Sequence, residues 1–494
     1  MRSLLLSGVA GLVLVAAFPP YGQAYLTVPC VAVLLWVLRT APSCRVAIGS
    51  AGVFGLAFFG MLFPWLSELG LEAFMPLWIL QSVYACLFGW WAWRVRGLPP
   101  LRWALAVVGG WAAFEAARGR FPFGGFEWGF LGYPMGEYAL TRDATQWIGT
   151  TGWSVLVALL AAGLALAVVE RHHTILAATS GVVMLLMAAG AVWPATADGP
   201  TVRVAVIQGS TPCPGSKCVD ERLRTWQTHL DLTRSLPDGS ADLVVWAEGS
   251  SGGFAADPVL IPEVGEAMGA EAARIGAALL AGGDRPISDA EWVNANVVFD
   301  RSGAIVGEYR KRLPVPFGEY IPARSFFDWI PALSAVPRDM VPGDGPVVFD
   351  LHFGTLGSVV SWEGSFARFS RDEVLVGAEL LAVATNQGSY PYSVASDQLI
   401  GMTRMRSAEL GTDLVHAGVV GRSTIITDSG QFGPVTGLAT SEILTGEVQL
   451  RTAGPTLYAR FGNWVQWLAV LASLAVTARF PAQVTAGGRD DSAP

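Results

Sequence analysis

Charged residues are scarce in this chain of 494 residues: they make up 15% of it, whereas apolar residues make up 52%. With a positive mean hydropathy, these proportions exclude an ordinary soluble protein and indicate a membrane protein with a soluble part. The sequence also has no basic tract and no nucleic-acid-binding motif, so a nucleic-acid-binding protein is excluded. Its length allows two or three domains.

Cysteine is rare as well, with five in the chain. Cys30, Cys44 and Cys86 lie in or next to apolar runs, where a cysteine behaves as a small apolar residue. Cys213 and Cys218 lie close together in the polar part of the chain. Their spacing leaves two alternatives open, a small-loop disulfide or two free thiols. Further ligands are missing nearby, so we expect no metal site and no cofactor.

Long apolar runs are abundant, and seven of the eight precede the polar part of the chain. Several approach the roughly 20 residues that are needed to cross a bilayer, so we expect eight transmembrane helices. For the first run, which follows Arg2, a cleaved signal peptide is the alternative. The runs cover residues 3–18, 24–38, 46–66, 74–93, 101–117, 152–169, 174–194 and 463–478.

The distribution of arginine predicts the orientation of these helices, because positive residues near span ends favour the cytoplasm. The arginines fall on alternate connections between the apolar runs. We therefore expect both termini inside and residues 195–462 outside the membrane. The arginines concerned are Arg2, Arg39, Arg45, Arg94, Arg96, Arg102 and Arg171.

The polar part of the chain alternates between strand and helix patterns, which indicates an α/β sandwich of two sheets with helices outside. We expect the segment 282–284, Gly-Gly-Asp, to form a turn, because no phosphate-loop pattern surrounds it. Strands are expected at 202–208, 242–248, 277–281, 380–385, 414–417 and 423–427, hairpins at 292–308 and 347–362, and helices at 219–236, 261–276 and 397–410.

A long loop is expected between residues 118 and 151, and it is rich in Gly, Phe and Trp. Aromatic rings of this kind favour the headgroup level of a bilayer. Two interpretations stay open for them, ordinary interfacial packing or a direct role in the entry of lipid.

Three segments carry the residues of a possible catalytic site. Glu248 follows an apolar strand, Lys311 lies in the proline- and glycine-rich segment 309–322, and Ser361 lies at the end of another strand. Acyl transfer through a covalent intermediate needs a base, a donor for the tetrahedral oxyanion and a nucleophile. A glutamate, a lysine and a nucleophile of this kind are typical of the nitrilase type of site.

The chain resembles the apolipoprotein N-acyltransferases, the membrane-embedded branch of the nitrilase superfamily, over nearly its full length. The resemblance rests on the Trp-x-Glu strand end at 246–248, on Tyr-x-Lys at 309–311 and on Val-Pro-Phe-Gly-Glu-Tyr-x-Pro at 315–322. The eight runs, Phe-Pro-Pro-Tyr at 18–21 and Met-Arg-Ser-Ala-Glu at 405–409 agree with it.

The resemblance implies a domain layout and a role for each candidate residue. Residues 1–195 would form a membrane domain of seven helices, 196–462 an extracytoplasmic nitrilase-like αββα domain, and 463–494 the eighth helix and a cytoplasmic tail. The protein would reside in a bacterial cell membrane. Glu248 would be the general base, Lys311 the oxyanion stabiliser and Ser361 the nucleophile. The supporting residues would be Glu319, Glu363, Trp246 and Asn386.

The sequence departs from the family pattern at the nucleophile. The family has Cys-Tyr-Glu where this chain has Ser-Trp-Glu at 361–363, and Thr-Asn-Asp where it has Thr-Asn-Gln at 385–387. A thiol ionises near pH 8.5, whereas an unassisted hydroxyl stays protonated. The histidines at 229, 352 and 416 lack a nucleophile-elbow context, so we expect them to be packed or solvated.

Two functions follow from the resemblance. The first is an enzyme that transfers an acyl chain from a membrane phospholipid, through an ester on Ser361, to the N-terminal diacylglyceryl-cysteine of lipoproteins. The second is a catalytically inactive paralogue that serves as a membrane scaffold or binds lipoproteins. Retention of Glu248 and Lys311 favours the enzyme, and the missing thiol favours the scaffold, since a fold does not prove activity.

Overall fold

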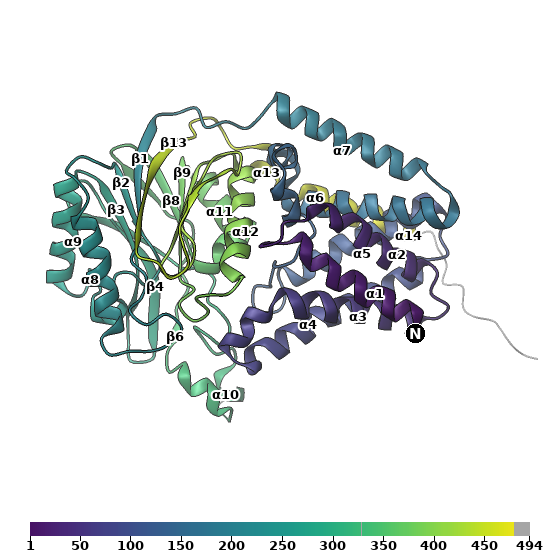
Figure 1. The fold of residues 1–494 in the computed structure, drawn as a ribbon, viewed down its shortest axis with the longest axis horizontal. Coiled ribbons are helices and arrows are strands. Elements are labelled where there is room, and N and C mark those ends of the chain that lie inside the picture. Colours follow the sequence, from purple (N-terminus) through teal and green to yellow (C-terminus); the bar gives the residue numbers. More distant parts are fainter. Residues whose placement is uncertain (328, 479–494) are drawn as a thin grey trace, which may run out of the picture.

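The computed structural model describes residues 1–327 and 329–478. It consists of a helical bundle, built mostly from the first 192 residues, and an α/β part beside one end of that bundle (Figure 1). The tail that the sequence predicts falls mainly on residues 479–494, outside the described residues.

Each of the eight apolar runs forms a helix of the bundle. In the described part of the chain, four helices are long and apolar enough to cross a membrane: α3, α4, α6 and α7. Helices α1, α2 and α14 are apolar but shorter, and α5 contains three charged residues. The helices are α1 (Arg2–Leu14), α2 (Thr27–Arg39), α3 (Cys44–Leu62), α4 (Leu71–Val95), α5 (Pro100–Arg118), α6 (Ala139–Glu170), α7 (Thr174–Val192) and α14 (Trp464–Thr477).

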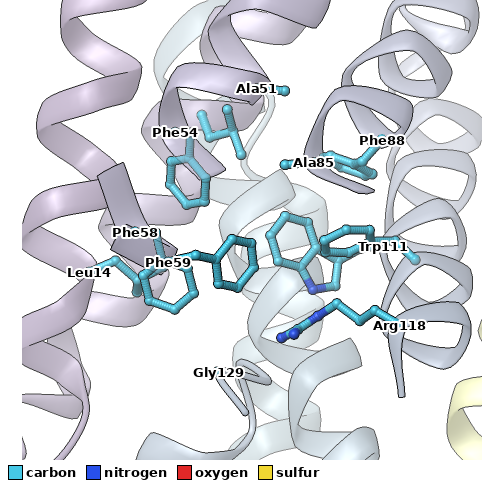
Figure 2. Close-up of a pocket in the computed structure, with 12 residues that line it drawn as sticks. Leu14, Ala51, Phe54, Phe58, Phe59, Ala85, Phe88, Trp111, Arg118 and Gly129 are labelled. Atoms are coloured by element: carbon cyan, nitrogen blue, oxygen red, sulfur yellow. The ribbon is translucent and has the colours of Figure 1, made fainter. Parts of the chain in front are cut away.

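A small apolar pocket lies inside the bundle, and Arg118 closes one end of it (Figure 2). Aromatic rings form most of the wall, among them Phe58, Phe59 and Trp111. The guanidinium of Arg118 donates to the side chain of Gln81 and to the carbonyls of residues 126 and 128. These hydrogen bonds engage both terminal nitrogens of a buried cation and fix the start of the following loop to the bundle.

That loop is shorter than the sequence suggests. We expected it to extend over 118–151, but α6 begins at Ala139, and only residues 119–138 connect it to α5. The segment 139–148 has too few apolar residues to read as a span, yet it is helical. Helix α6 is interrupted at Gly149, whose φ of 67° breaks the helical backbone. A side chain at this position would collide with the ring of Tyr458.

The α/β part contains two sheets. Among the described residues, the first has the order β13-β1-β2-β3-β4-β5, with β6 paired to β4, and the second has the order β12-β11-β10-β9-β8-β7. The first comprises β1 (Thr201–Gln208), β2 (Leu243–Trp246), β3 (Ala278–Pro286), β4 (Glu291–Phe299), β5 (Ile305–Arg310), β6 (Asp339–Met340) and β13 (Glu442–Gln449). The second comprises β7 (Val348–Leu351), β8 (Gly354–Val360), β9 (Leu380–Thr385), β10 (Leu414–Gly418), β11 (Thr424–Ile426) and β12 (Phe432–Val435).

The sheets pack face to face, and helices cover both outer faces. One apolar core lies between the sheets, where β1 and β2 meet β8, β9 and β10. A second core lies between the first sheet and α8 (Glu221–Arg234) and α9 (Pro262–Ile275). Helices α11 (Ala367–Leu375) and α12 (Ala395–Leu410) lie between the second sheet and the bundle (Figure 1). The expected α/β sandwich is therefore confirmed.

One expectation for the α/β part is wrong, and some of its strands were not predicted. Strands β12 and β13 were missed, because their exposed, partly polar residues hide the apolar alternation of a half-buried strand. Residues 282–284 are not a turn but belong to β3. The glycines occur there because other chain segments come close: a Cβ on Gly282 would lie 2.7 Å from the Cα of Glu248.

A buried ion pair joins the α/β part to the bundle. Arg406 and Glu409 of α12 lie 2.8 Å apart, and both are 1% exposed. Both contact Thr150 of α6, just after the interruption of that helix: Glu409 accepts from its amide, and Arg406 donates to its hydroxyl. Arg406 also donates to the carbonyl of Ser365, which accepts from Tyr133 as well. Residues beside the candidate nucleophile are thus tied to the bundle.

Candidate active site

The three candidate residues lie just after the ends of three strands. Glu248 lies two residues after β2, Lys311 directly after β5 and Ser361 directly after β8. Because β2 and β5 belong to one sheet and β8 to the other, the face-to-face packing brings the three strand ends together. The Nζ atom of Lys311 lies 3.6 Å from Oε1 of Glu248, and Ser361 lies close enough to Glu248 to lower the pKa of its carboxyl.

The surroundings of Glu248 are those that a general base requires. The side-chain amide of Asn294 donates to its Oε1 at 2.7 Å. Burial raises the pKa of this carboxyl above its ordinary value, and Lys311, Asn294 and Ser361 oppose that effect. A raised pKa makes a carboxylate a stronger proton acceptor, which is the property that a general base for a hydroxyl or an amine requires.

Lys311 is fully buried and held by two carboxylates. Its Nζ donates to Oε1 of Glu319 at 2.6 Å and lies within ion-pair distance of Glu248. Burial disfavours the charged form, but Glu319 and Glu248 outweigh it and hold the pKa of Lys311 above its ordinary value. The second oxygen of Glu319 accepts from the amide of Val315. Lys311 is therefore a fixed cation, as the stabilisation of an oxyanion requires.

Ser361 has a backbone conformation that is unusual for a residue other than glycine. Its φ is 60°, in the left-handed region, and its side chain is half-buried. It begins the short 3-10 turn Ser361–Ser365. Strained backbone of this kind occurs at functional sites, where it presents a side chain that an ordinary strand end would direct elsewhere.

Glu363 supports the site through its hydrogen bonds. Its Oε1 accepts from the amides of Arg312 and Leu313 at 2.5 and 2.8 Å. Its Oε2 accepts from the amide of Val360 at 3.0 Å and from the hydroxyl of Tyr309 at 2.9 Å. This fully buried carboxylate therefore links the segment that contains Lys311 to the end of β8, where Ser361 follows.

The two remaining supporting candidates occupy different places. Trp246 faces away from the site, toward α8, where its indole donates to Thr233 at 2.9 Å. Asn386 is exposed and lies beside Gly249, the neighbour of Glu248. Sequence reasoning missed Asn294, which no motif marks. No local signal could have found it, because its place beside Glu248 depends on the register of β4 with β3.

Among the described residues, no hydrogen bond or ion pair joins the histidines or the cysteine pair to Glu248, Lys311 or Ser361. His229 and His416 are fully buried, as expected for packed histidines, and burial lowers the pKa of His229 to about 4. Cys213 and Cys218 form a disulfide. The loop that it closes contacts the segment after β9, where the amide of Gly215 donates to the carbonyl of Gly388.

Comparisons with known proteins agree with this arrangement. The apolipoprotein N-acyltransferase N-terminal domain matches residues 10–163, and the carbon-nitrogen hydrolase family matches residues 203–458. Apolipoprotein N-acyltransferase of Mycolicibacterium smegmatis is 31% identical, over 94% of this chain and 83% of the relative. That of Methylococcus capsulatus is 29% identical, over 94% of this chain and 93% of the relative.

The crystal structure of a carbon-nitrogen hydrolase from Helicobacter pylori is 18% identical, with a TM-score of 0.38 over 55% of this chain and 94% of that one. The family models and the full-length relatives, rather than this distant likeness, show the relationship. They show that this chain belongs to the apolipoprotein N-acyltransferase family, and its helical bundle and α/β sandwich coincide with the two matched ranges.

Proposed function

We propose that this protein transfers an acyl chain from a membrane phospholipid to the N-terminal amine of a diacylglyceryl-cysteine lipoprotein, with Ser361 as nucleophile. The observation that carries the proposal is the meeting of Ser361, Glu248 and the buried cation Lys311 at three neighbouring strand ends. The full-length relatives named apolipoprotein N-acyltransferase support the reaction class.

The reaction has two halves. In the first, the Ser361 oxygen attacks an ester carbonyl of the phospholipid while Glu248 takes the proton of the Ser361 hydroxyl. Lys311 stabilises the oxyanion that forms. The lysophospholipid oxygen leaves with that proton. In the second, the amine attacks the ester on Ser361, its proton passes through Glu248 to the serine oxygen, and the amide is released. Glu319 and Glu363 hold Lys311 and its segment in place.

A serine changes the energetics of this site compared with a cysteine. A hydroxyl loses its proton much less readily than a thiol, so the proton must pass to Glu248 during the attack. The raised pKa of Glu248 supports this role. The left-handed backbone at Ser361 is a conformation that residues other than glycine rarely adopt, which favours a functional role for this serine over a structural one.

We infer that all eight helices cross a bacterial cell membrane and that the α/β part lies on the extracytoplasmic side, with both termini in the cytoplasm. Residues 1–195 and 463–478 then form the membrane domain. In support, Arg39 contacts Glu170 and the carbonyls of Arg96 and Leu98, so three arginine-bearing connections meet at one bundle end. That end lies away from the α/β part (Figure 1). Labelling of single cysteines introduced at Arg45 and Arg301 from either side of the membrane tests this orientation.

The reaction itself is tested by N-acylation of a model lipoprotein, measured by mass spectrometry in cells depleted of their own acyltransferase. We compare the natural protein with Ser361→Ala, Ser361→Cys and Glu248→Gln. Acylation by the natural protein, but not by the alanine and glutamine variants, supports an enzyme with a serine nucleophile. Acylation by the cysteine variant alone would instead assign the natural protein a non-catalytic role in the membrane.

A further inference from the structure

Strands β3 and β4 carry polar side chains next to Glu248 that the catalytic roles above do not use. Asp284 of β3 pairs in register with Asn294 of β4, and Gly282 pairs with Asn296. Asn294 donates to Glu248, and the missing side chain of Gly282 lets the Glu248 backbone approach. Residues two apart in a strand point to the same face. Asp284 therefore lies on the face of β3 that Glu248 approaches at Gly282.

The acceptors on this face lack donors. Asn294 is 2% exposed, and among residues 1–327 and 329–478 its Oδ1 accepts no hydrogen bond; the same holds for Oδ1 of the fully buried Asn296. Buried polar atoms are satisfied in nearly all proteins, so acceptors left open beside a catalytic carboxylate indicate a place for a donor from outside the chain.

The charges around Glu248 lead to the same conclusion. Glu248, Glu319 and Asp284 interact electrostatically with one another, and the cations among them are Lys311 and Arg222. This leaves one more carboxylate than cation. Arg222 lies 3.6 Å from Asp284, and its side chain is 52% exposed, so solvent weakens its attraction for Asp284. Burial raises the pKa of Asp284 to about 6. The group is therefore suited to bind a further cation.

We propose that Asp284 and Asn294 bind the α-ammonium group of the acceptor beside Glu248, a step that rests on the function proposed above. An ammonium offers three N–H donors, and the Asp284 carboxylate and Asn294 Oδ1 are two acceptors for them. The Asp284 side chain is 21% exposed and that of Glu248 8%, so Asp284 lies on the more open side of this pair.

This placement gives a route to each of the two protons that the ammonium group loses during the reaction. The ammonium loses one proton to solvent along the exposed side of Asp284. The neutral amine then attacks the acyl carbon, so that the nitrogen–carbon bond forms and the bond from that carbon to the Ser361 oxygen breaks. The second proton passes through Glu248 to the Ser361 oxygen, which restores the hydroxyl.

The test separates the two halves of the reaction in the full-length protein in nanodiscs. Asp284→Asn is compared with Asp350→Asn, an exposed aspartate of β7 in the same α/β part. We expect Asp284→Asn to raise the KM for a diacylglyceryl-cysteinyl peptide roughly tenfold or more, as the loss of a charge-assisted hydrogen bond implies. The rate of the lysophospholipid burst without acceptor should change much less than the KM, because Asp284 acts on that half only through its charge near Glu248. An unchanged KM, or equal losses in both halves, would overturn the assignment.

A binding experiment gives a readout that does not need turnover. The same peptide is compared with an analogue in which a hydroxyl replaces the α-amino group. The natural protein should bind the amine more tightly, Asp284→Asn should bind both equally, and Arg222→Gln should bind the amine more tightly still, because it removes a competing cation. A purely structural role for Asp284 would weaken both peptides alike. If the natural protein releases no lysophospholipid, the proposed function fails, while this comparison still decides whether Asp284 binds the amine.

Discussion

Replacing Glu363 with glutamine removes the charge that holds the catalytic segments together, and the structure allows the cost to be worked out. A glutamine oxygen can still accept from the amides of Arg312 and Leu313, but its NH₂ group then faces the amide of Val360 and the hydroxyl of Tyr309. The Tyr309 hydroxyl can turn to accept, since it already accepts from the Arg312 side chain. The Val360 amide can only donate, so in this variant it is left without an acceptor.

An unsatisfied buried amide costs about 1–3 kcal/mol, and the two hydrogen bonds that remain each lose about 1 kcal/mol when their acceptor loses its charge. We therefore expect Glu363→Gln to lower the free energy of unfolding by about 3–5 kcal/mol. Because the affected segment contains Lys311, lysophospholipid release should fall at least about tenfold, which corresponds to about 1.4 kcal/mol of the activation barrier.

The assay is denaturant-induced unfolding of the purified protein in detergent, followed by tryptophan fluorescence. Glu447→Gln, which changes an exposed carboxylate of β13, is the matched control and should shift stability by no more than about 0.5 kcal/mol. If Glu363→Gln unfolds like this control and keeps its activity, the hydrogen bonds of Glu363 do not hold the site, and the reasoning is refuted.

Three further predictions follow. Burial raises the pKa of Glu373 from 4.5 to about 8, so the folded protein favours its protonated form. Its contribution to the free energy of unfolding is therefore present at low pH and is lost as the pH rises from 4.5 to about 8. Glu373→Gln should flatten the pH dependence of unfolding, and an unchanged slope would contradict this. Arg406→Met leaves Glu409 buried without its partner and should destabilise the protein by about 3–5 kcal/mol, whereas the double change with Glu409→Met should recover much of the loss in the same unfolding assay. Cys213→Ser with Cys218→Ser opens a small loop and should cost about 2 kcal/mol; equal stability of the reduced and oxidised natural protein would refute it.

The sequence predicted most of the helices and strands, because their signals are local. Each apolar run is a helix, and the strands that end before Glu248 and Ser361 carry the apolar residues of the inter-sheet core. Strand β13 escaped prediction because its stability comes from pairing with the distant β1, not from its own composition. The first turns of α6 escaped for a similar reason, since their polar residues pack against other parts of the protein.

The residue types of the candidate site could be predicted from the sequence, but the directions in which their side chains point could not. In an unbroken strand, Trp246 and Glu248 would face the same side. The strand ends at Trp246, however, and the chain turns at Gly249 with a φ of 73°, so Glu248 enters the site while Trp246 packs against α8. Asn294 and Asp284 depend on the register of β3 with β4, which a motif cannot supply.

The proposed reaction depends most on Ser361 as the nucleophile, and the covalent intermediate tests this role directly. The purified protein is incubated with phospholipid in the absence of acceptor, digested and examined by mass spectrometry for an acyl group on the peptide that contains Ser361. The account predicts an acyl ester on Ser361 in the natural protein and none in Ser361→Ala or Glu248→Gln. A natural protein that stays unmodified, while Ser361→Cys forms a thioester under the same conditions, would contradict it.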